Sequence, residues 1–148
     1  MALETMTKLS RVDVGVGGSA TITFTNIPQT YTDLKLVFST RDTVGAQYIS
    51  INGNTSSLTG KGLYGSGSAA NSENFSGSIG TISNPSSYTA STFANCEFYF
   101  PNYSGNTYKS FSFEGVSETN ATTAYMEMVS GLWSNSVSYT HLRAHETS

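Results

Sequence analysis

TFANCEFYFP, residues 92–101, is the stretch that decides the fold class. Small or apolar side chains occupy every second position from Cys96 to Phe100, with Glu and Tyr between them. Successive side chains of a β-strand point to opposite faces of a sheet, so this period of two predicts a strand with one buried face. A turn-forming stretch follows, and YKSFSFEGVSE at residues 108–118 repeats the alternation with two further phenylalanines. The two segments together indicate neighbouring antiparallel strands.

The same pattern extends in both directions along the chain. We predict strands at residues 20–26, 33–41, 47–52 and 124–133, and a hairpin in which residues 9–14 pair with 20–26 across a glycine turn at 15–18. Residues 59–88 are rich in Gly, Ser and Asn, which predicts a long functional or packing loop with one short strand at most. Low complexity is the alternative interpretation of that segment. No segment sustains a helical period over two turns.

These strands predict an all-β fold, a single antiparallel β-sandwich of jelly-roll type over residues 1–135. Such a sandwich buries the apolar face of each strand between two sheets. The predicted core consists of Ile22, Phe24, Leu34, Leu36, Phe38, Ile49, Ile51, Phe98, Phe100, Phe111, Phe113, Met126, Met128 and Leu132.

Composition limits the possible partners. Only 11% of the 148 residues are charged and the formal net charge is −3, so nothing provides the basic surface that nucleic acid binding needs. No run approaches the ~20 apolar residues of a membrane span, and we expect neither membrane insertion nor a signal peptide. Cys96 is the only cysteine, which excludes an intrachain disulfide and predicts a small buried hydrophobe on its strand.

The C-terminal run VSYTHLRAHET, residues 137–147, closely resembles the translated end of a transposase-type sequencing-library adapter. The resemblance implies that residues 136–148 do not belong to the natural protein and that the domain, residues 1–135, lacks its natural C-terminus. Segments of this origin are set aside before a fold is inferred. We would therefore distrust a strand formed by this segment.

Catalytic signatures are sparse. His141 and His145 stand four residues apart beside Glu146, a spacing that hints at zinc on a helix. Both histidines fall in the adapter-like run, so we expect no metal site, no other cofactor and no catalytic histidine. Two carboxylate pairs, Asp33 with Asp42 and Glu114 with Glu118, have the residue types of a glycosidase. We interpret all four as solvated charges at strand ends.

Tyrosines are the best candidates for ligand or partner contacts. Tyr31, Tyr64, Tyr88 and Tyr103 fall in expected turns or loops, where a ring can stack on a sugar or anchor a protein interface. The alternative is that they cover the edges of the core. Trp133 ends an apolar strand, and we expect it to be a core residue rather than a ligand platform.

Several segments taken together resemble a small virion-associated protein common in uncultured marine tailed phages. They are MALET at the start, IPQTYTDL at 27–34, FPNY at 100–103 with KSF at 109–111, NATTA at 120–124 and GLW at 131–133. The likeness covers nearly all of residues 1–135. Proteins of this kind are regarded as tail-fibre, head-fibre or capsid-decoration components and have no established catalytic residues. They continue past the Trp segment with further strands, which also favours a truncated chain here.

The expected function is therefore a non-enzymatic structural protein of a phage virion, a surface fibre, decoration or appendage subunit made in the host cytoplasm. The low charge fraction suits extensive protein contact, so we expect other virion proteins as partners and a homo-oligomer. The alternative is a carbohydrate-binding β-sandwich module that reads a cell-surface glycan through residues 59–88 and their tyrosines.

Overall fold

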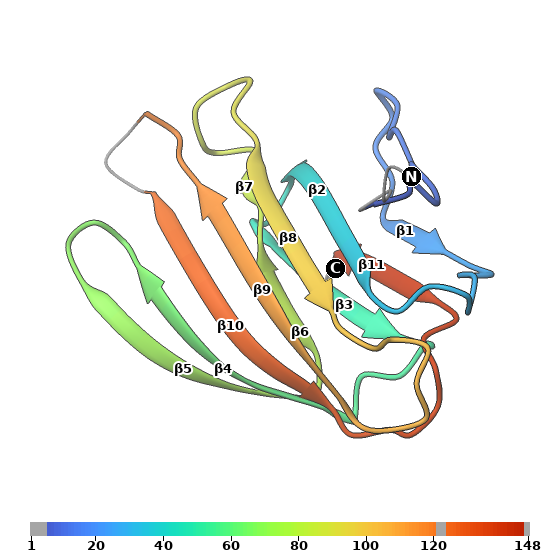
Figure 1. The fold of residues 1–148 in the computed structure, drawn as a ribbon. Helices are drawn as coiled ribbons and strands as arrows, with labels where there is room; N and C mark the ends of the chain where they lie inside the picture. The colour runs from blue at the N-terminus through green and yellow to red at the C-terminus, as the bar shows by residue number, and fades with distance from the viewer. Residues whose placement is uncertain (1–5, 121–123, 147–148) are drawn as a thin grey trace.

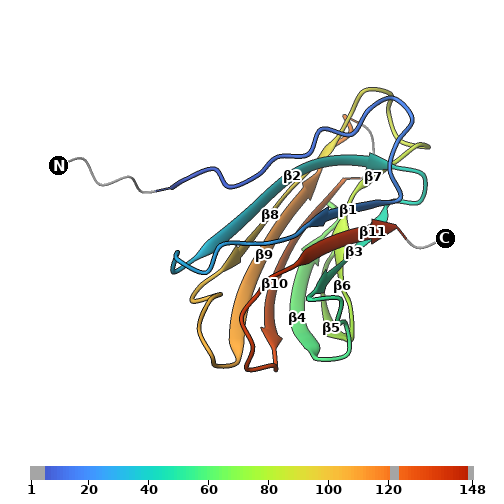
Figure 2. The same ribbon diagram turned by 90° about the vertical axis from the view of Figure 1, so that its right-hand side faces the viewer.

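The computed structural model describes residues 6–120 and 124–146. Within these residues the fold is all-β, with eleven strands arranged as a seven-stranded and a four-stranded sheet. Figure 2 shows the two sheets as separate layers, with the large sheet curling around the small one. The predicted two-sheet β-sandwich is confirmed. No helix in the described ranges is long and apolar enough to span a membrane.

The large sheet runs across Figure 1 from β5 at the left to β2 at the right. Its order is β5 (Ala70–Ser76), β4 (Leu58–Gly65), β10 (Tyr125–Trp133), β9 (Lys109–Ser117), β8 (Ala94–Phe100), β2 (Leu34–Asp42) and β7 (Asn84–Pro85). All its strand pairs are antiparallel except β2 with β7. The small sheet has the order β1 (Thr21–Phe24), β11 (Leu142–Glu146), β3 (Ala46–Ile51) and β6 (Ile79–Ile82).

An aromatic cluster from the middle of the large sheet forms the centre of the core. Phe98 stacks with Phe100 at 5.6 Å between ring centroids and packs against Phe113 at 4.6 Å. Trp133, also fully buried as predicted, meets Tyr139 edge-on at 4.7 Å. These contacts place the inward faces of β8, β9 and β10 against the small sheet. For β8 and β9, the alternation of apolar residues in the sequence predicts these buried faces.

The prediction of a long loop over residues 59–88 is wrong. Three strands, β4, β5 and β6, and the short β7 lie in that range. Every second residue of β4 faces inward, namely Leu58, Gly60, Gly62 and Tyr64. Because two of these four are glycines without a side chain, the sequence shows no alternation of apolar and polar residues. A Cβ on Gly60 would meet Val129 at 3.2 Å, so the neighbouring strand needs this space.

The predicted N-terminal hairpin is also wrong in its first arm. Residues 9–14 form no strand, although Gly18 closes the expected turn by donating its N–H to the Gly15 carbonyl at 2.9 Å. β1 pairs instead with β11, with Ile22 opposite Ala144. Ile22 and Phe24 are only partly buried in this outer strand, so they contribute less to the core than predicted.

The face assignment of β10 is inverted relative to the prediction. Met126, Met128 and Leu132 point to solvent, whereas Val129 and Trp133 point into the core. Both faces of this strand carry apolar residues, and hydrophobicity alone could not choose between them. Because side chains alternate, burying Trp133 also turns Glu127 into the space between the sheets.

The adapter-like segment is integrated into the described fold. β11 lies between β1 and β3 in the small sheet, and Tyr139 and Leu142 are buried in the core. Asn52 holds the residues that precede β11 in place. Its side-chain oxygen accepts hydrogen bonds from the N–H groups of Thr140 and His141 at 2.8 and 2.9 Å. The position of β11 in the small sheet does not test the origin of residues 136–148, which stays a prediction.

Candidate functional site

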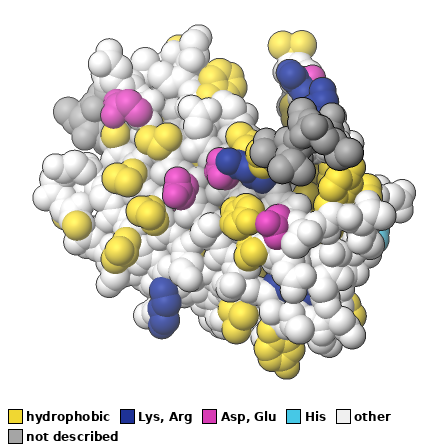
Figure 3. All heavy atoms as spheres, in the orientation of Figure 1, with side chains coloured by type: hydrophobic (Ala, Val, Ile, Leu, Met, Phe, Trp, Pro, Cys, Tyr) yellow, Lys and Arg dark blue, Asp and Glu magenta, His cyan; other side chains and the backbone are white. Residues whose placement is uncertain are grey.

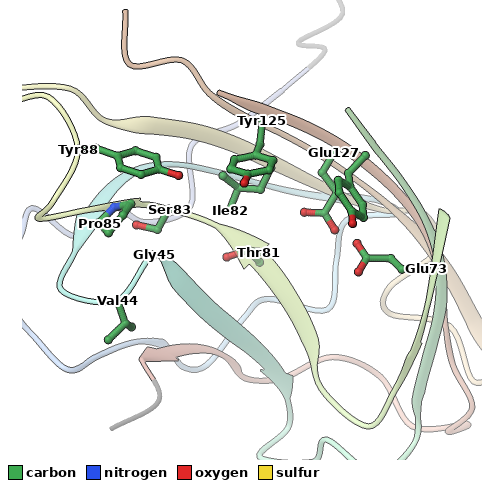
Figure 4. Close-up of a pocket in the computed structure, with 11 residues that line it drawn as sticks. Val44, Gly45, Glu73, Thr81, Ile82, Ser83, Pro85, Tyr88, Tyr125 and Glu127 are labelled. Carbon is green, nitrogen blue, oxygen red and sulfur yellow. The ribbon is translucent and has the colours of Figure 1, made fainter. Parts of the chain in front are cut away.

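A cavity of about 290 Å³ lies between the two sheets, where β4, β5 and the start of β10 face β6 and the β2–β3 turn. Figure 4 shows it with its lining side chains as sticks. Two carboxyl groups, three tyrosines and two hydroxyl side chains converge there. The lining consists of Val44, Gly45, Tyr64, Glu73, Thr81, Ile82, Ser83, Pro85, Tyr88, Tyr125 and Glu127. We call this cavity the inter-sheet pocket.

Glu127 is positioned by the alternation of β10. It lies directly opposite Tyr64 of β4 in the antiparallel ladder and is only 8% exposed. Charged side chains are almost never so buried unless they are paired. Figure 4 shows its carboxyl group pointing toward that of Glu73.

Glu73 reaches Glu127 because a glycine stands between their strands. Glu73 of β5 is the ladder partner of Gly62 in β4. A Cβ on Gly62 would lie 3.1 Å from Glu73 Cγ and 2.8 Å from the ring of Phe75. The missing side chain therefore leaves room for the Glu73 side chain to cross β4 toward β10.

Burial and a hydrogen bond to Glu73 change the acidity of the Glu127 carboxyl. Burial raises the pKa of Glu127 to about 8, with the negative charge of Glu73 and the hydrogen bond to Glu73 adding to the effect. At neutral pH the Glu127 carboxyl is therefore mainly protonated and donates to the Glu73 carboxylate. We call Glu73 and Glu127 the acid pair.

Tyr88 is carried by a loop that Arg41 holds in place. The guanidinium of Arg41 donates to the carbonyl oxygens of Thr89 and Tyr88 at 3.0 Å and of Ser86 at 3.1 Å. A planar group with several fixed donors is suited to gathering carbonyls in this way. Burial, then the neighbouring Tyr125, raises the pKa of Tyr88.

Thr81 and Ser83 supply hydroxyl groups to the wall formed by β6 and the residue after it. Both side chains are more than nine-tenths buried, and neither hydroxyl oxygen has a hydrogen-bond partner within the described structure. Buried polar groups are usually satisfied, and an exception points to a missing water, ion or ligand. These two hydroxyl groups are therefore the unsatisfied polar groups of the pocket wall.

Two of the four predicted tyrosines belong to the pocket. Tyr64 and Tyr88 line it, whereas Tyr31 is exposed on the loop before β2 and does not. Tyr103 is fully buried and its hydroxyl donates to the Pro28 carbonyl, so the structure places it in the core.

The carboxylates considered from the sequence form no pair. Asp33 accepts hydrogen bonds from the Tyr99 hydroxyl and the Asn102 N–H at the surface, which hold its pKa below the usual value. The expectation of a solvated charge is wrong for Asp42, which is buried and accepts the N–H groups of Val44 and Gly45 within the β2–β3 turn. Glu114 and Glu118 are exposed at positions on and after β9, as expected for solvated charges.

No group of three or more His, Cys, Asp and Glu residues gathers in the part of the chain that the structure describes. The predicted zinc spacing involves the side chains of His145 and Glu146, which lie outside the described residues. Cys96 is buried as predicted, and burial, followed by the charge of Glu127, raises its thiol pKa to about 12. A reactive cysteine requires a lowered thiol pKa, so this raised pKa does not favour a reactive thiolate.

Sequence reasoning missed Glu73, Glu127 and Tyr125. A signal for Glu127 existed, because a buried Trp133 and a period of two place position 127 on the inner face. Glu73 gave no signal, since it lies in a polar stretch with no hydrophobic alternation, ANSENFS.

Comparison with known proteins adds no family. The chain matches no protein-family model, and no curated protein and no solved structure matches it significantly.

Proposed function

We propose that the protein is a non-enzymatic structural subunit of a phage virion surface, a fibre, decoration or appendage protein, and that it assembles as a homo-oligomer. The observation that carries the proposal is an apolar patch on the solvent face of the large sheet. The sequence resemblance to virion-associated proteins supports the same role.

The patch consists of Leu63, Val116, Met126 and Met128. They lie on adjacent strands, with Met126 opposite Val116 and Met128 opposite Leu63. Leu63 is 65% exposed and Met126 56% exposed. Figure 3 shows hydrophobic side chains gathered over β4, β9 and β10 on this face. We call these four residues the outer patch.

An outer patch of this kind is unusual on a solvent-facing sheet. The outward positions of a sandwich are ordinarily polar, and contiguous exposed apolar patches mark interaction sites. Methionine is enriched in interfaces, and its flexible side chain adapts to a partner surface. Burying the patch against a second subunit would remove this apolar area from water and stabilise an assembly.

The test is the oligomeric state in solution. Light scattering behind size-exclusion chromatography, over a concentration series, should show an oligomer that Met128→Glu dissociates. Thr23→Glu, an exposed strand position on the small sheet, is the control and should leave the oligomer intact. A wild-type monomer at all concentrations, or equal effects of both variants, contradicts assembly through the patch. The virion role is tested separately by mass spectrometry of purified particles, in which the protein must be found.

A second candidate function is carbohydrate binding. It is favoured by the position of Tyr64 and Tyr88 in one pocket with unpaired hydroxyl groups. Aromatic rings and convergent polar groups are the usual components of sugar sites. Binding to a glycan array that is lost in a Tyr88→Ala variant would support this role, and absence of any glycan binding would reject it.

A further inference from the structure

We propose that the inter-sheet pocket binds a small organic cation that carries an ammonium group. The inference concerns the pocket alone and goes beyond the structural role proposed above. It rests on four properties of the lining: an acid pair, no basic residue, three tyrosines and two unpaired hydroxyls.

The acid pair lacks a positive partner. No Lys or Arg lines the pocket, and the ion pairs within the described residues are Arg11 with Asp13 and Lys35 with Glu97. The nearby guanidinium of Arg41 is committed to loop carbonyls. Taking a carboxylate out of water is costly unless a cation or hydrogen bonds compensate it. An ammonium group between Glu73 and Glu127 would provide that compensation.

Three tyrosines surround the same space. Tyr64 comes from β4, Tyr125 from β10 and Tyr88 from the loop after β7. Figure 4 shows the rings of Tyr88 and Tyr125 along one side of the cavity. The negative face of an aromatic ring attracts a cation, and groups of such rings recognise alkylated ammonium ligands.

Thr81 and Ser83 complete the polar wall. Their hydroxyl oxygens can accept a hydrogen bond from an ammonium N–H or exchange one with a hydroxyl on the ligand. This observation is independent of the acid pair, because Thr81 lies on β6 of the opposite sheet, Ser83 directly follows that strand, and both hydroxyls are unsatisfied in their own right.

Size restricts the ligand. The cavity of about 290 Å³ is at the lower end of the ~300–1,000 Å³ range of small-molecule sites. It suits a compact head group rather than an extended chain. An anion would be repelled by Glu73, and a neutral polyol would leave the acid pair without a counter-charge.

Cation binding must be coupled to the ionisation of Glu127. The titratable groups that face Glu127 are Glu73 from β5, Tyr64 from β4, Tyr125 from its own strand and the Cys96 thiol from β8. Near neutrality the Glu127 carboxyl changes charge, whereas burial keeps the Cys96 thiol protonated. A bound cation favours the ionised carboxyl, so binding should release a proton from Glu127.

The experiment is calorimetric titration of the full chain with choline and with its uncharged isostere 3,3-dimethylbutan-1-ol. Choline keeps its charge at every pH, so any pH dependence comes from the protein. We expect choline to bind at least about tenfold more tightly than the alcohol, a preference of ~1.4 kcal/mol or more. Its affinity should increase between about pH 6 and pH 8, with proton release that shows as a buffer-dependent heat.

Variants separate the pocket from the rest of the surface. Glu127→Gln should remove the pH dependence and the proton release, and Glu73→Gln combined with Glu127→Gln should abolish the preference for choline. Glu114→Gln, an exposed carboxylate on the outer face of the same sheet, is the matched control and should bind like wild type. Circular dichroism checks that each variant is folded. Equal binding of choline and the alcohol, tighter binding of glucose than of choline, or no binding of choline by folded wild-type protein would overturn the proposal.

Discussion

Replacing Glu127 by Gln should stabilise the protein above neutral pH. Glutamine keeps the volume of the side chain, and its amide can still donate a hydrogen bond to the Glu73 carboxylate. It removes the ionisation that burial and Glu73 oppose. The variant therefore isolates the cost of placing a second negative charge in the inter-sheet pocket.

The sign and size of the effect follow from the raised pKa. Between the ordinary carboxyl pKa of 4.5 and the folded-state pKa of about 8, the folded chain holds one proton that the unfolded chain has lost. The free energy of unfolding of the wild type should therefore fall with rising pH by up to about 1.4 kcal/mol per pH unit. Two units amount to about 3 kcal/mol, or a decrease in Tm of about 8 °C for a domain of this size.

The assay is thermal unfolding followed by circular dichroism from about pH 5.5 to pH 7.5. Wild type should lose stability across this range, and Glu127→Gln should show a much flatter profile and the higher Tm at the upper end. Glu114→Gln, on the exposed face of the sheet, should keep the wild-type slope. Parallel profiles for wild type and Glu127→Gln would refute the buried acid pair.

Three further changes test the packing. Gly131→Ala places a Cβ 2.1 Å from the ring of Phe111, and urea denaturation should show a loss of about 1–3 kcal/mol or more. Deleting residues 136–148 removes β11 from the middle of the small sheet; the shortened chain should give no cooperative melting transition, and a wild-type Tm would show that the strand is dispensable. Arg41→Ala should release the loop that carries Tyr88, seen as faster amide exchange in that loop with little change at β9.

The central strands β8 and β9 are predictable because their large apolar residues lie mainly on one face and polar residues mainly on the other. β8 buries Cys96, Phe98 and Phe100 and exposes polar or amphipathic residues, so period and face agree. β4 could not be recognised, because Gly60 and Gly62 fill its inward positions. In such a strand, side chains from neighbouring strands fill the space above each glycine. The strand's own sequence therefore shows no alternation of apolar and polar residues.

β10 shows a different limit. Met126 and Met128 are as apolar as Val129, and only tertiary packing selects which set is buried. Of the eleven residues that line the pocket, the sequence predicts two, Tyr64 and Tyr88, as candidates for ligand or partner contacts. The acid pair was not predicted, because it depends on the register of β5, β4 and β10, which brings positions 73 and 127 together across a glycine.

Direct titration of the two carboxyl groups tests the central claim, that Glu73 and Glu127 share a proton inside the sandwich. Carbon-13 NMR of glutamate-labelled protein reports the ionisation of each side-chain carboxyl, with Glu127→Gln and Glu73→Gln for assignment. A coupled pair titrates with two apparent pKa values that belong to both groups. We expect one transition near pH 8 that disappears in Glu127→Gln. If every glutamate carboxyl titrates in one group near the ordinary value of about 4.3, the acid pair does not exist and the proposed ligand chemistry of the pocket is contradicted.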